Sequence, residues 1–222
     1  MKKFFILAAM MTATVAANAQ YTPEAGKIST EVQFNPFGQS YNQFKIDGVK
    51  FRYFIAENQA VRLNLNFGLD KGSKGEAKKD DGKSKVTNSE TTFGIGLGYE
   101  YHFAQNERIS AYAGAGLSFE TVSTKIKSEG YSEYEIKNLY EENGKYYANG
   151  YNEFGVKVFT GVDFYVYKGL YVGTELGFAF NNFKYKKGSV KVGDNSTDYD
   201  AQYKETTLGF YIEPSVRLGW TF

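Results

Sequence analysis

The chain has 222 residues, no cysteine, one histidine and a formal net charge of +1. A near-neutral charge argues against nucleic acid as a partner, because such a partner favours a basic face, and the lack of cysteine excludes disulfides and thiolate metal sites. The 19 Tyr, 19 Phe and 24 Gly accompany a mean hydropathy of −0.46. Many aromatic and glycine residues, with no apolar run after the N-terminal segment that could form a transmembrane helix, favour a β-barrel with alternating apolar and lumen-facing residues.

Residues 1–19 are predicted to be a secretory signal peptide. Two lysines precede an apolar run that closes with Ala17-Asn18-Ala19, which is the order of a basic n-region, an h-region and an Ala-x-Ala cleavage site. A membrane anchor is the alternative, but the run is shorter than the ~20 apolar residues that span a bilayer. We therefore expect cleavage before Gln20 and a single domain over residues 20–222.

Alternation of apolar and polar residues predicts eight strands, because a period of two is that of a strand with two unlike faces. The stretch 210–222 alternates over about twice the ~5–6 residues of an ordinary strand, a length that suffices to cross a bilayer at a tilt. In chain order the predicted strands cover residues 28–35, 49–55, 61–69, 93–103, 109–120, 154–166, 170–180 and 210–222.

The predicted connections alternate between short and long. Short turns are expected at residues 57–59, 105–107 and 167–169, and long connections at 35–42, 70–89, 125–152 and 184–204. Segments 70–89 and 184–204 are polar and are interpreted as solvated loops. Sorting of turns and loops to opposite ends is typical of outer-membrane barrels. The predicted fold is an all-β, eight-stranded antiparallel up-and-down transmembrane β-barrel with short periplasmic turns and longer extracellular loops.

Two local features bear on this fold. Aromatic residues near strand ends predict girdles at the two membrane interfaces: Tyr101, Phe103, Phe164, Trp220 and Phe222 at the turn end, and Phe34, Phe67, Phe93, Phe154 and Phe180 at the loop end. Pro214 lies inside the last strand, where it removes a ladder hydrogen bond. We expect a β-bulge at or near Pro214.

Charged residues at inward positions predict a network in the lumen, since an eight-stranded barrel is just wide enough for side chains to fill. Five basic and six acidic residues point inward, nearly balanced as buried charges require: Glu31, Lys50, Arg52, Arg62, Glu100, Glu120, Lys157, Asp163, Glu175, Glu213 and Arg217. All but Lys50, Glu120 and Lys157 are expected to form the network, with Arg217 between Glu31 and Glu175 across the seam of the first and last strands. We interpret this set as a structural plug that blocks conduction, and a switchable salt-bridge gate is the alternative.

The segment 130–151 is the candidate surface-contact loop. It carries Tyr131, Tyr134, Tyr140, Tyr146, Tyr147 and Tyr151 among charges, and tyrosine offers a large rigid surface with a polar group. The alternative is that these tyrosines stabilise a hairpin that extends the two flanking strands, because cross-strand aromatic pairs stabilise hairpins.

Catalysis has little support in the sequence. The one histidine, His102, faces inward near the turn end and is interpreted as a hydrogen-bonded filler. No residues have the ligand spacing of a transition-metal site, and the glycines of Gly94-Ile95-Gly96-Leu97-Gly98 lie in strand register, where they make room in the lumen. We therefore expect no enzyme activity and no cofactor.

With Trp220-Thr221-Phe222 at its end and this strand pattern, the chain resembles the small eight-stranded outer-membrane β-barrel family of Gram-negative bacteria. That family includes OmpA transmembrane domains, OmpX and opacity-type proteins, and the Ala-Asn-Ala-Gln region is similar to that of Bacteroidetes members. The resemblance implies that Trp220 and Phe222 form the signal read by the barrel assembly machinery, although Arg217 stands where that signal commonly has Gly.

We expect a monomer in outer-membrane lipid with a structural or surface-interaction, adhesion-type role. The tyrosine-rich segment 130–151 makes an extracellular protein or glycan the candidate ligand. Two alternatives remain at this stage: a narrow or gated pore for small molecules, and a lipid-modifying enzyme. A soluble periplasmic barrel is the alternative fold. It would bury its apolar residues inside, so the orientation of Leu63, Leu97 and Leu176 distinguishes the two folds.

Overall fold

The computed structural model describes residues 22–34, 46–77, 83–130, 133–200 and 204–222. Within these ranges the chain forms thirteen strands: β1 (Ile28–Phe34), β2 (Ile46–Ala56), β3 (Gln59–Ala77), β4 (Lys83–Gln105), β5 (Ile109–Glu129), β6 (Tyr134–Lys137), β7 (Leu139–Glu142), β8 (Lys145–Ala148), β9 (Tyr151–Tyr167), β10 (Leu170–Tyr185), β11 (Gly188–Val192), β12 (Asn195–Tyr199) and β13 (Lys204–Thr221). No helix in the described ranges is long and apolar enough to cross a membrane. The proposed signal peptide lies outside the described residues.

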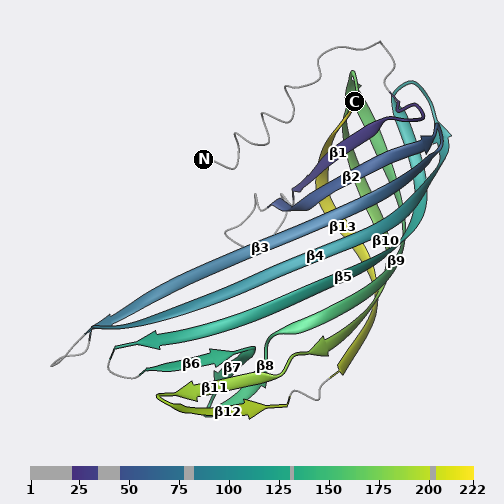
Figure 1. Ribbon diagram of the computed structural model, residues 1–222. Coiled ribbons are helices and arrows are strands. Elements are labelled where there is room, and N and C mark those ends of the chain that lie inside the picture. The colour runs from purple at the N-terminus through teal and green to yellow at the C-terminus, as the bar shows by residue number, and fades with distance from the viewer. Residues whose placement is uncertain (1–21, 35–45, 78–82, 131–132, 201–203) are drawn as a thin grey trace.

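The sheet closes on itself. Antiparallel pairings follow the order β1, β2, β3, β4, β5, β9, β10 and β13, and β13 pairs back onto β1 from Ser29↔Thr221 to Phe34↔Val216. This closed ring is the barrel at the upper right of Figure 1. Closure leaves no free edge in the wall, as lipid requires of a β-structure. The predicted all-β barrel is confirmed.

The two faces of the barrel wall are sorted as the alternation predicts. Leu97 and Val158 are 60% and 54% exposed, and Leu176 is also exposed on the outer surface. In contrast, Glu100 and Arg217 are fully buried in the lumen. This orientation is opposite to that of a soluble barrel, and it suits an outer face in hydrocarbon.

Aromatic side chains mark both ends of the outer surface. Phe67, Phe93, Phe154 and Phe180 are exposed toward the loop end, and Tyr101, Phe103 and Phe164 are exposed toward the turn end. Trp220 and Phe222 are half-buried at the turn end. The side chain of Phe34 lies outside the described part of the chain. The described aromatics have the two-girdle arrangement of outer-membrane barrels.

The predicted solvated loop at 70–89 is wrong, because β3 and β4 continue far beyond the apolar band as a hairpin. Their pairing runs without interruption from Leu69↔Thr91 to Ala77↔Lys83, and these strand ends extend to the lower left in Figure 1. The sequence shows no apolar periodicity here because successive residues, such as 70–73, are exposed on both faces of the strand. Cross-strand hydrogen bonds hold it without an apolar face.

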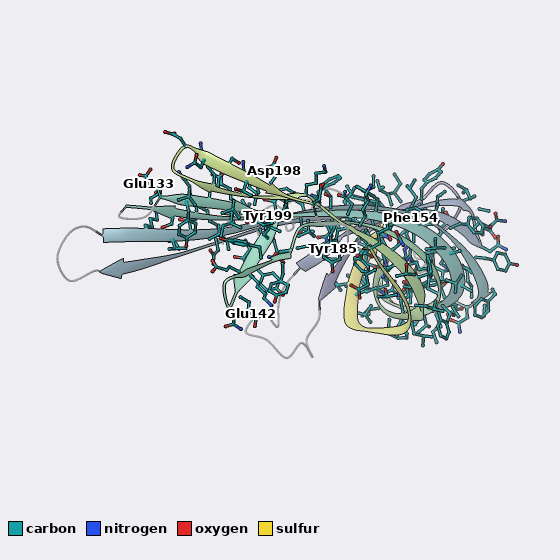
Figure 2. All side chains as sticks on the ribbon, turned by 90° about the horizontal axis from the view of Figure 1, so that it is seen from below. Glu133, Glu142, Phe154, Tyr185, Asp198 and Tyr199 are labelled. Atoms are coloured by element: carbon teal, nitrogen blue, oxygen red, sulfur yellow. The ribbon has the colours of Figure 1, made fainter. Side chains whose placement is uncertain are left out.

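Strands also replace the long connections predicted at 125–152 and 184–204. These segments contain β6, β7, β8, β11 and β12, which together with the outer ends of β3, β4 and β5 form an external lobe. β6 pairs with β5 and β11, and β11 pairs with β12. Ile136, Leu139 and Val190 form its small buried core, and Ile126, Tyr134, Tyr146 and Tyr199 pack against it. In Figure 2 Glu133, Glu142 and Asp198 mark this lobe, well away from Phe154 on the barrel wall.

The predicted bulge at Pro214 is confirmed. The pairs Gly173↔Arg217 and Glu175↔Glu213 leave three residues of β13, 214–216, opposite Thr174 alone. A proline has no N–H for the ladder, so a bulge is where a closed sheet can accept it. The Arg217 Nη2 donates a hydrogen bond of 3.0 Å to the Thr174 carbonyl oxygen, which ties a lumen side chain to the irregular backbone.

Candidate functional site

Among the described residues, four cations and four carboxylates meet in the lumen, contributed by β1, β2, β3, β4, β9, β10 and β13. They are Lys50, Arg52, Arg62 and Arg217 with Glu31, Glu100, Asp163 and Glu175. Each lies at an inward position of its strand, and none is more than 7% exposed. Equal numbers of opposite charges are what a buried network needs, because an unpaired buried ion is strongly destabilising.

Arg52 lies at the centre of this network and contacts three carboxylates from three strands. Its Nη2 lies 3.1 Å from Glu31 Oε2, and its Nη1 lies 3.2 Å from Glu100 Oε2 and 2.7 Å from Asp163 Oδ2. The Asp163 contact reaches from β2 across the lumen to β9. A planar guanidinium can donate to several acceptors at once, which a lysine ammonium does with less geometric definition.

Arg62 connects β3 to the opposite wall through a two-pronged contact. Its Nη1 and Nη2 lie 2.8 and 3.1 Å from the two oxygens of Glu175 on β10. The same Nη1 also lies 2.8 Å from Glu100 Oε1. Bidentate arginine–carboxylate pairs are among the strongest hydrogen-bonded contacts in proteins.

Arg217 lies between Glu31 and Glu175 at the seam of β1 and β13. Its Nη1 is 3.4 Å from Glu31 Oε1 and 3.6 Å from Glu175 Oε2, and its Nη2 is 3.1 Å from Asp163 Oδ1. Lys50 approaches the same two glutamates at 2.9 and 3.8 Å. The charges therefore form one connected layer.

Aromatic rings pack against the charged layer on both sides, with Tyr171 toward the turns and Phe159 toward the loops. The Arg52 guanidinium lies 4.8 Å from the Tyr171 ring centroid, and that of Arg62 lies 3.7 Å from the Phe159 ring. The Tyr171 hydroxyl donates to Glu31 Oε2 at 3.1 Å. Phe54 and Tyr165 are fully buried beside this layer. Guanidinium–ring contacts of this kind are favourable when shielded from water.

Inward glycines provide the space for these large side chains. A Cβ at Gly219 would overlap the Tyr171 ring, and a Cβ at Gly173 would overlap Asp163 Oδ1 and crowd Arg217 Nη2. At Gly98, in the glycine stretch of β4, a Cβ would lie 2.9 Å from Arg62 Cγ. The lumen thus accommodates the network by close approach of the backbone on several sides.

On the loop side of the charged layer the lumen opens into a cavity of about 380 Å³. Lys50 and Glu31 lie at its base, and Asn66, Glu120 and Lys157 line its walls. Asn66 Nδ2 donates to Glu120 Oε2 at 3.1 Å. This cavity has mixed charge and opens toward the external lobe.

His102 takes part in an arrangement that has the order of a catalytic triad. Its Nδ1 lies 2.7 Å from Ser110 Oγ, and its Nε2 lies 3.5 Å from Glu100 Oε2. Ser110 and Glu100 are fully buried, and the histidine ring packs against Phe54 and Tyr112. A substrate has no access to the serine oxygen, and Glu100 already binds two arginines. His102 and Ser110 therefore form a buried hydrogen bond beside the Glu100 carboxylate.

The predicted tyrosine set divides into two groups. Tyr134 and Tyr146 pack against the lobe core, and Tyr151 packs edge-on against Phe183. Tyr140 and Tyr147 are both 40% exposed and stack across the β7–β8 hairpin with ring centroids 5.1 Å apart. Tyr131 lies outside the described residues.

The remaining predicted residues are placed as follows. Trp220 lies opposite Thr30 of β1 and Leu170 of β10, and the Phe222 amide donates to the Ile28 carbonyl at 2.8 Å. The side chain of Glu213 lies outside the described part of the chain. Sequence reasoning placed Lys50 inward but outside the network, and it missed Phe54 and Tyr165. Both residues occupy inward positions in the alternation of their strands, and this was the available signal. Their neighbours near the turns are also aromatic, so inward and outward positions do not differ in polarity there.

The sequence matches the family model described as "Outer membrane protein beta-barrel domain" over residues 5–138, which is more than half of the chain. No curated protein matches it. Among solved structures it is similar to the N-terminal β-barrel domain of Pseudomonas aeruginosa OprF, with 11% identity, a TM-score of 0.38, and 90% of this chain and 100% of that chain covered.

Two further structures share this level of similarity. Ail, the attachment invasion locus protein of Yersinia pestis, has 12% identity and a TM-score of 0.30 over 89% of this chain and 99% of that chain. Acinetobacter baumannii CarO has 15% identity and a TM-score of 0.32 over 92% and 99%. The family model, with the closed ring and outward apolar face, supports one conclusion. The chain belongs to the outer membrane protein beta-barrel domain family and resides in the lipid of a Gram-negative outer membrane.

Proposed function

We propose that this protein is a monomeric, non-enzymatic outer-membrane barrel with a closed lumen and a structural and surface-interaction, adhesion-type role. The observation that carries the closure is the layer of four cations and four carboxylates at no more than 7% exposure. An ion could cross this layer only by separating buried pairs, and breaking one such pair costs about 3–5 kcal/mol. The aromatic layer beneath it adds a second barrier.

Planar-bilayer recording of the refolded protein tests the closure. We expect no discrete openings from the native chain or from Arg217→Ala, because Arg52 and Arg62 still bridge the lumen in that variant. Regular openings of the native chain would overturn the closed lumen. Openings that Arg217→Ala enlarges would support the gated pore.

The surface role is assigned to Tyr140 and Tyr147, supported by their exposure and stacking on the hairpin of the external lobe. A stacked pair presents a rigid apolar area with two hydroxyls and has little conformational entropy to lose on binding. An extracellular protein or glycan is the partner class that suits such a surface.

Adhesion of cells that carry Tyr140→Ser and Tyr147→Ser tests this role. Binding to immobilised extracellular-matrix glycoproteins and to a glycan array should fall to the level of cells without the protein. Tyr167→Ser is the matched control, since Tyr167 is also exposed but lies at the opposite end of the barrel. Unchanged adhesion, with the lobe still folded, would contradict the surface role.

Two steps of biogenesis belong to the same proposal. Residues 1–19 act as the cleaved signal peptide, and Trp220 with Phe222 forms the segment read by the barrel assembly machinery. Phe222→Ala should slow the appearance of heat-modifiable barrel in cells while leaving refolding in detergent unchanged. Normal assembly of this variant in cells would remove Phe222 from that role.

A further inference from the structure

Two lysines face each other just above the lipid-facing band of the barrel. Lys184 of β10 and Lys204 of β13 are direct cross-strand partners, and both are exposed. They lie on the outward face, in phase with the exposed Phe180 and Leu208. Like charges directly opposite one another destabilise a sheet. A bound anion between the two ammonium groups would remove this repulsion.

No carboxylate in the described part of the chain forms an ion pair with either lysine. Glu205, the chain neighbour of Lys204, points to the inner face, where its Oε2 accepts a hydrogen bond of 3.3 Å from the Tyr185 hydroxyl. Asp200 is paired with Lys187 at 2.9 Å. Within the described part of the chain, no side chain supplies the anion that would neutralise the pair.

The position of the pair matches the headgroup layer. Phe180 and Leu208 are register partners, followed by Asn182↔Thr206 and then Lys184↔Lys204. Four residues of a strand tilted by ~45° rise about 9 Å, which spans the interfacial layer above the hydrocarbon. Asn182 Nδ2 donates to Thr206 Oγ1 at 2.9 Å, so polar side chains fill the step between the apolar band and the lysines.

Near the loop end of the barrel, the described basic and acidic residues lie mostly on different faces of the wall. The outward positions carry Lys71, Lys125, Lys184 and Lys204, with Lys125 paired to Glu135 at 2.7 Å. The inward positions carry five acids and one lysine: Asp70, Glu90, Glu120, Glu153, Glu205 and Lys157. An anionic layer around the outside of the barrel would favour this distribution.

We propose that Lys184 and Lys204 bind a phosphate group of the outer-leaflet lipid, with Asn182 and Thr206 next to its sugar or ester oxygens. Basic side chains near a membrane are attracted to anionic headgroups, and lysine can extend its ammonium along an apolar surface toward them. This contact depends on the outer-membrane placement alone. It is independent of the closed lumen and of the tyrosine surface.

Lipid retention in phosphatidylcholine nanodiscs that contain a small share of bisphosphorylated lipid A tests the contact. Native mass spectrometry after mild detergent extraction counts the lipid A that stays bound. Lys184→Gln with Lys204→Gln should lower retention roughly tenfold or more, given about 1 kcal/mol per basic residue. Lys127→Gln with Lys191→Gln removes the same charge from the outer end of the lobe and should retain lipid A like the native chain.

Three outcomes would overturn the proposal. They are retention of dephosphorylated lipid A as strong as that of the bisphosphorylated form, equal losses in both double variants, and unchanged retention by the Lys184→Gln, Lys204→Gln chain. Detection of a second copy of the protein, and not of lipid A, in the mass spectrum would show that this face mediates self-association. That result would also overturn the proposal.

Lys184→Glu provides an independent readout, because it places a carboxylate opposite Lys204. In a neutral detergent this variant should unfold at a higher urea concentration than the native barrel, since a repulsive pair becomes attractive. In discs with bisphosphorylated lipid A the order should reverse. Greater stability of the variant in both environments would show that the lysines have no anionic partner and would contradict the proposal.

Discussion

Ion pairs between basic side chains and carboxylates occur in both the lumen and the external lobe, but they are buried in the lumen and exposed to water in the lobe. In the lumen, arginines contact two or three carboxylates each at full burial. In the lobe, pairs such as Lys125–Glu135 and Lys187–Asp200 have exposed or half-exposed partners. An exposed pair contributes about 0–1 kcal/mol, whereas breaking a buried pair costs about 3–5 kcal/mol. Barrel stability therefore depends on complete charge pairing, and lobe stability on a few apolar residues.

The largest expected effect comes from Arg52→Met. This change leaves Glu31, Glu100 and Asp163 short of their shared cation and should lower the free energy of unfolding by about 3–5 kcal/mol. Urea titration followed by heat-modifiable gel mobility measures it. Tyr53→Phe, the outward neighbour on the same strand, should stay close to the native value. A loss below about 1 kcal/mol for Arg52→Met would mean that the buried network contributes no more to stability than exposed ion pairs do.

Ile136→Ala should unfold the lobe and leave the barrel intact. In the described part of the lobe, Ile136 belongs to a core of three buried residues, and truncation of a buried isoleucine costs about 2–5 kcal/mol. Limited proteolysis should then cut between β6 and β8 while heat-modifiable mobility is unchanged. Val192→Ala, at an exposed lobe position, is the control. Joint loss of lobe and barrel would contradict the separation of the two regions.

Gly219→Ala tests the packing around the network without touching a charge. The added methyl group would overlap the Tyr171 ring, and such overpacking costs about 1–3 kcal/mol. The urea midpoint should fall by the corresponding amount. Gly72→Ala is the control, because the space around the Cβ position there is open. A native midpoint for Gly219→Ala would mean that the Tyr171 ring moves freely.

The smallest effect is a pH dependence confined to the lobe. Hydrogen bonds from Lys125 and then Lys137 lower the pKa of Glu135 from 4.5 to about 2. Because the folded pKa is the lower one, this interaction stabilises the lobe above about pH 4.5 and is lost as the pH falls toward 2. Amide hydrogen exchange of β6 should quicken across that range. Glu135→Gln should remove this dependence, and an unchanged profile would exclude Glu135 as its source.

The barrel could be predicted from sequence because the two faces of its wall meet different environments, hydrocarbon outside and a polar lumen inside. Alternation between hydrocarbon and lumen places Arg52, Glu100 and Asp163 inward, and Pro214 predicts its own bulge. The lobe could not be predicted in this way. Residues 70–73 of the β3–β4 extension are exposed on both faces, so Asp70 and Lys71 differ in charge and not in polarity, and the segment has the composition of a loop.

The partners within the network were also beyond the sequence. Arg52 of β2 meets Asp163 of β9 across the lumen, and that encounter depends on the stagger of the closed sheet and on the shift at Thr174. Neither is encoded in a single strand. The seam contact of Arg217 was within reach because β1 and β13 are neighbours at closure.

Thiol labelling of single-cysteine variants on β3 tests the closed lumen most directly, since the chain has no cysteine of its own. Asn66 lines the cavity on the loop side, Ala60 is fully buried on the turn side, and Arg62 lies between them on the same face. A membrane-impermeant maleimide added to intact cells should label Asn66→Cys and leave Ala60→Cys unlabelled. Labelling of both positions at similar rates would show an open lumen and contradict the account.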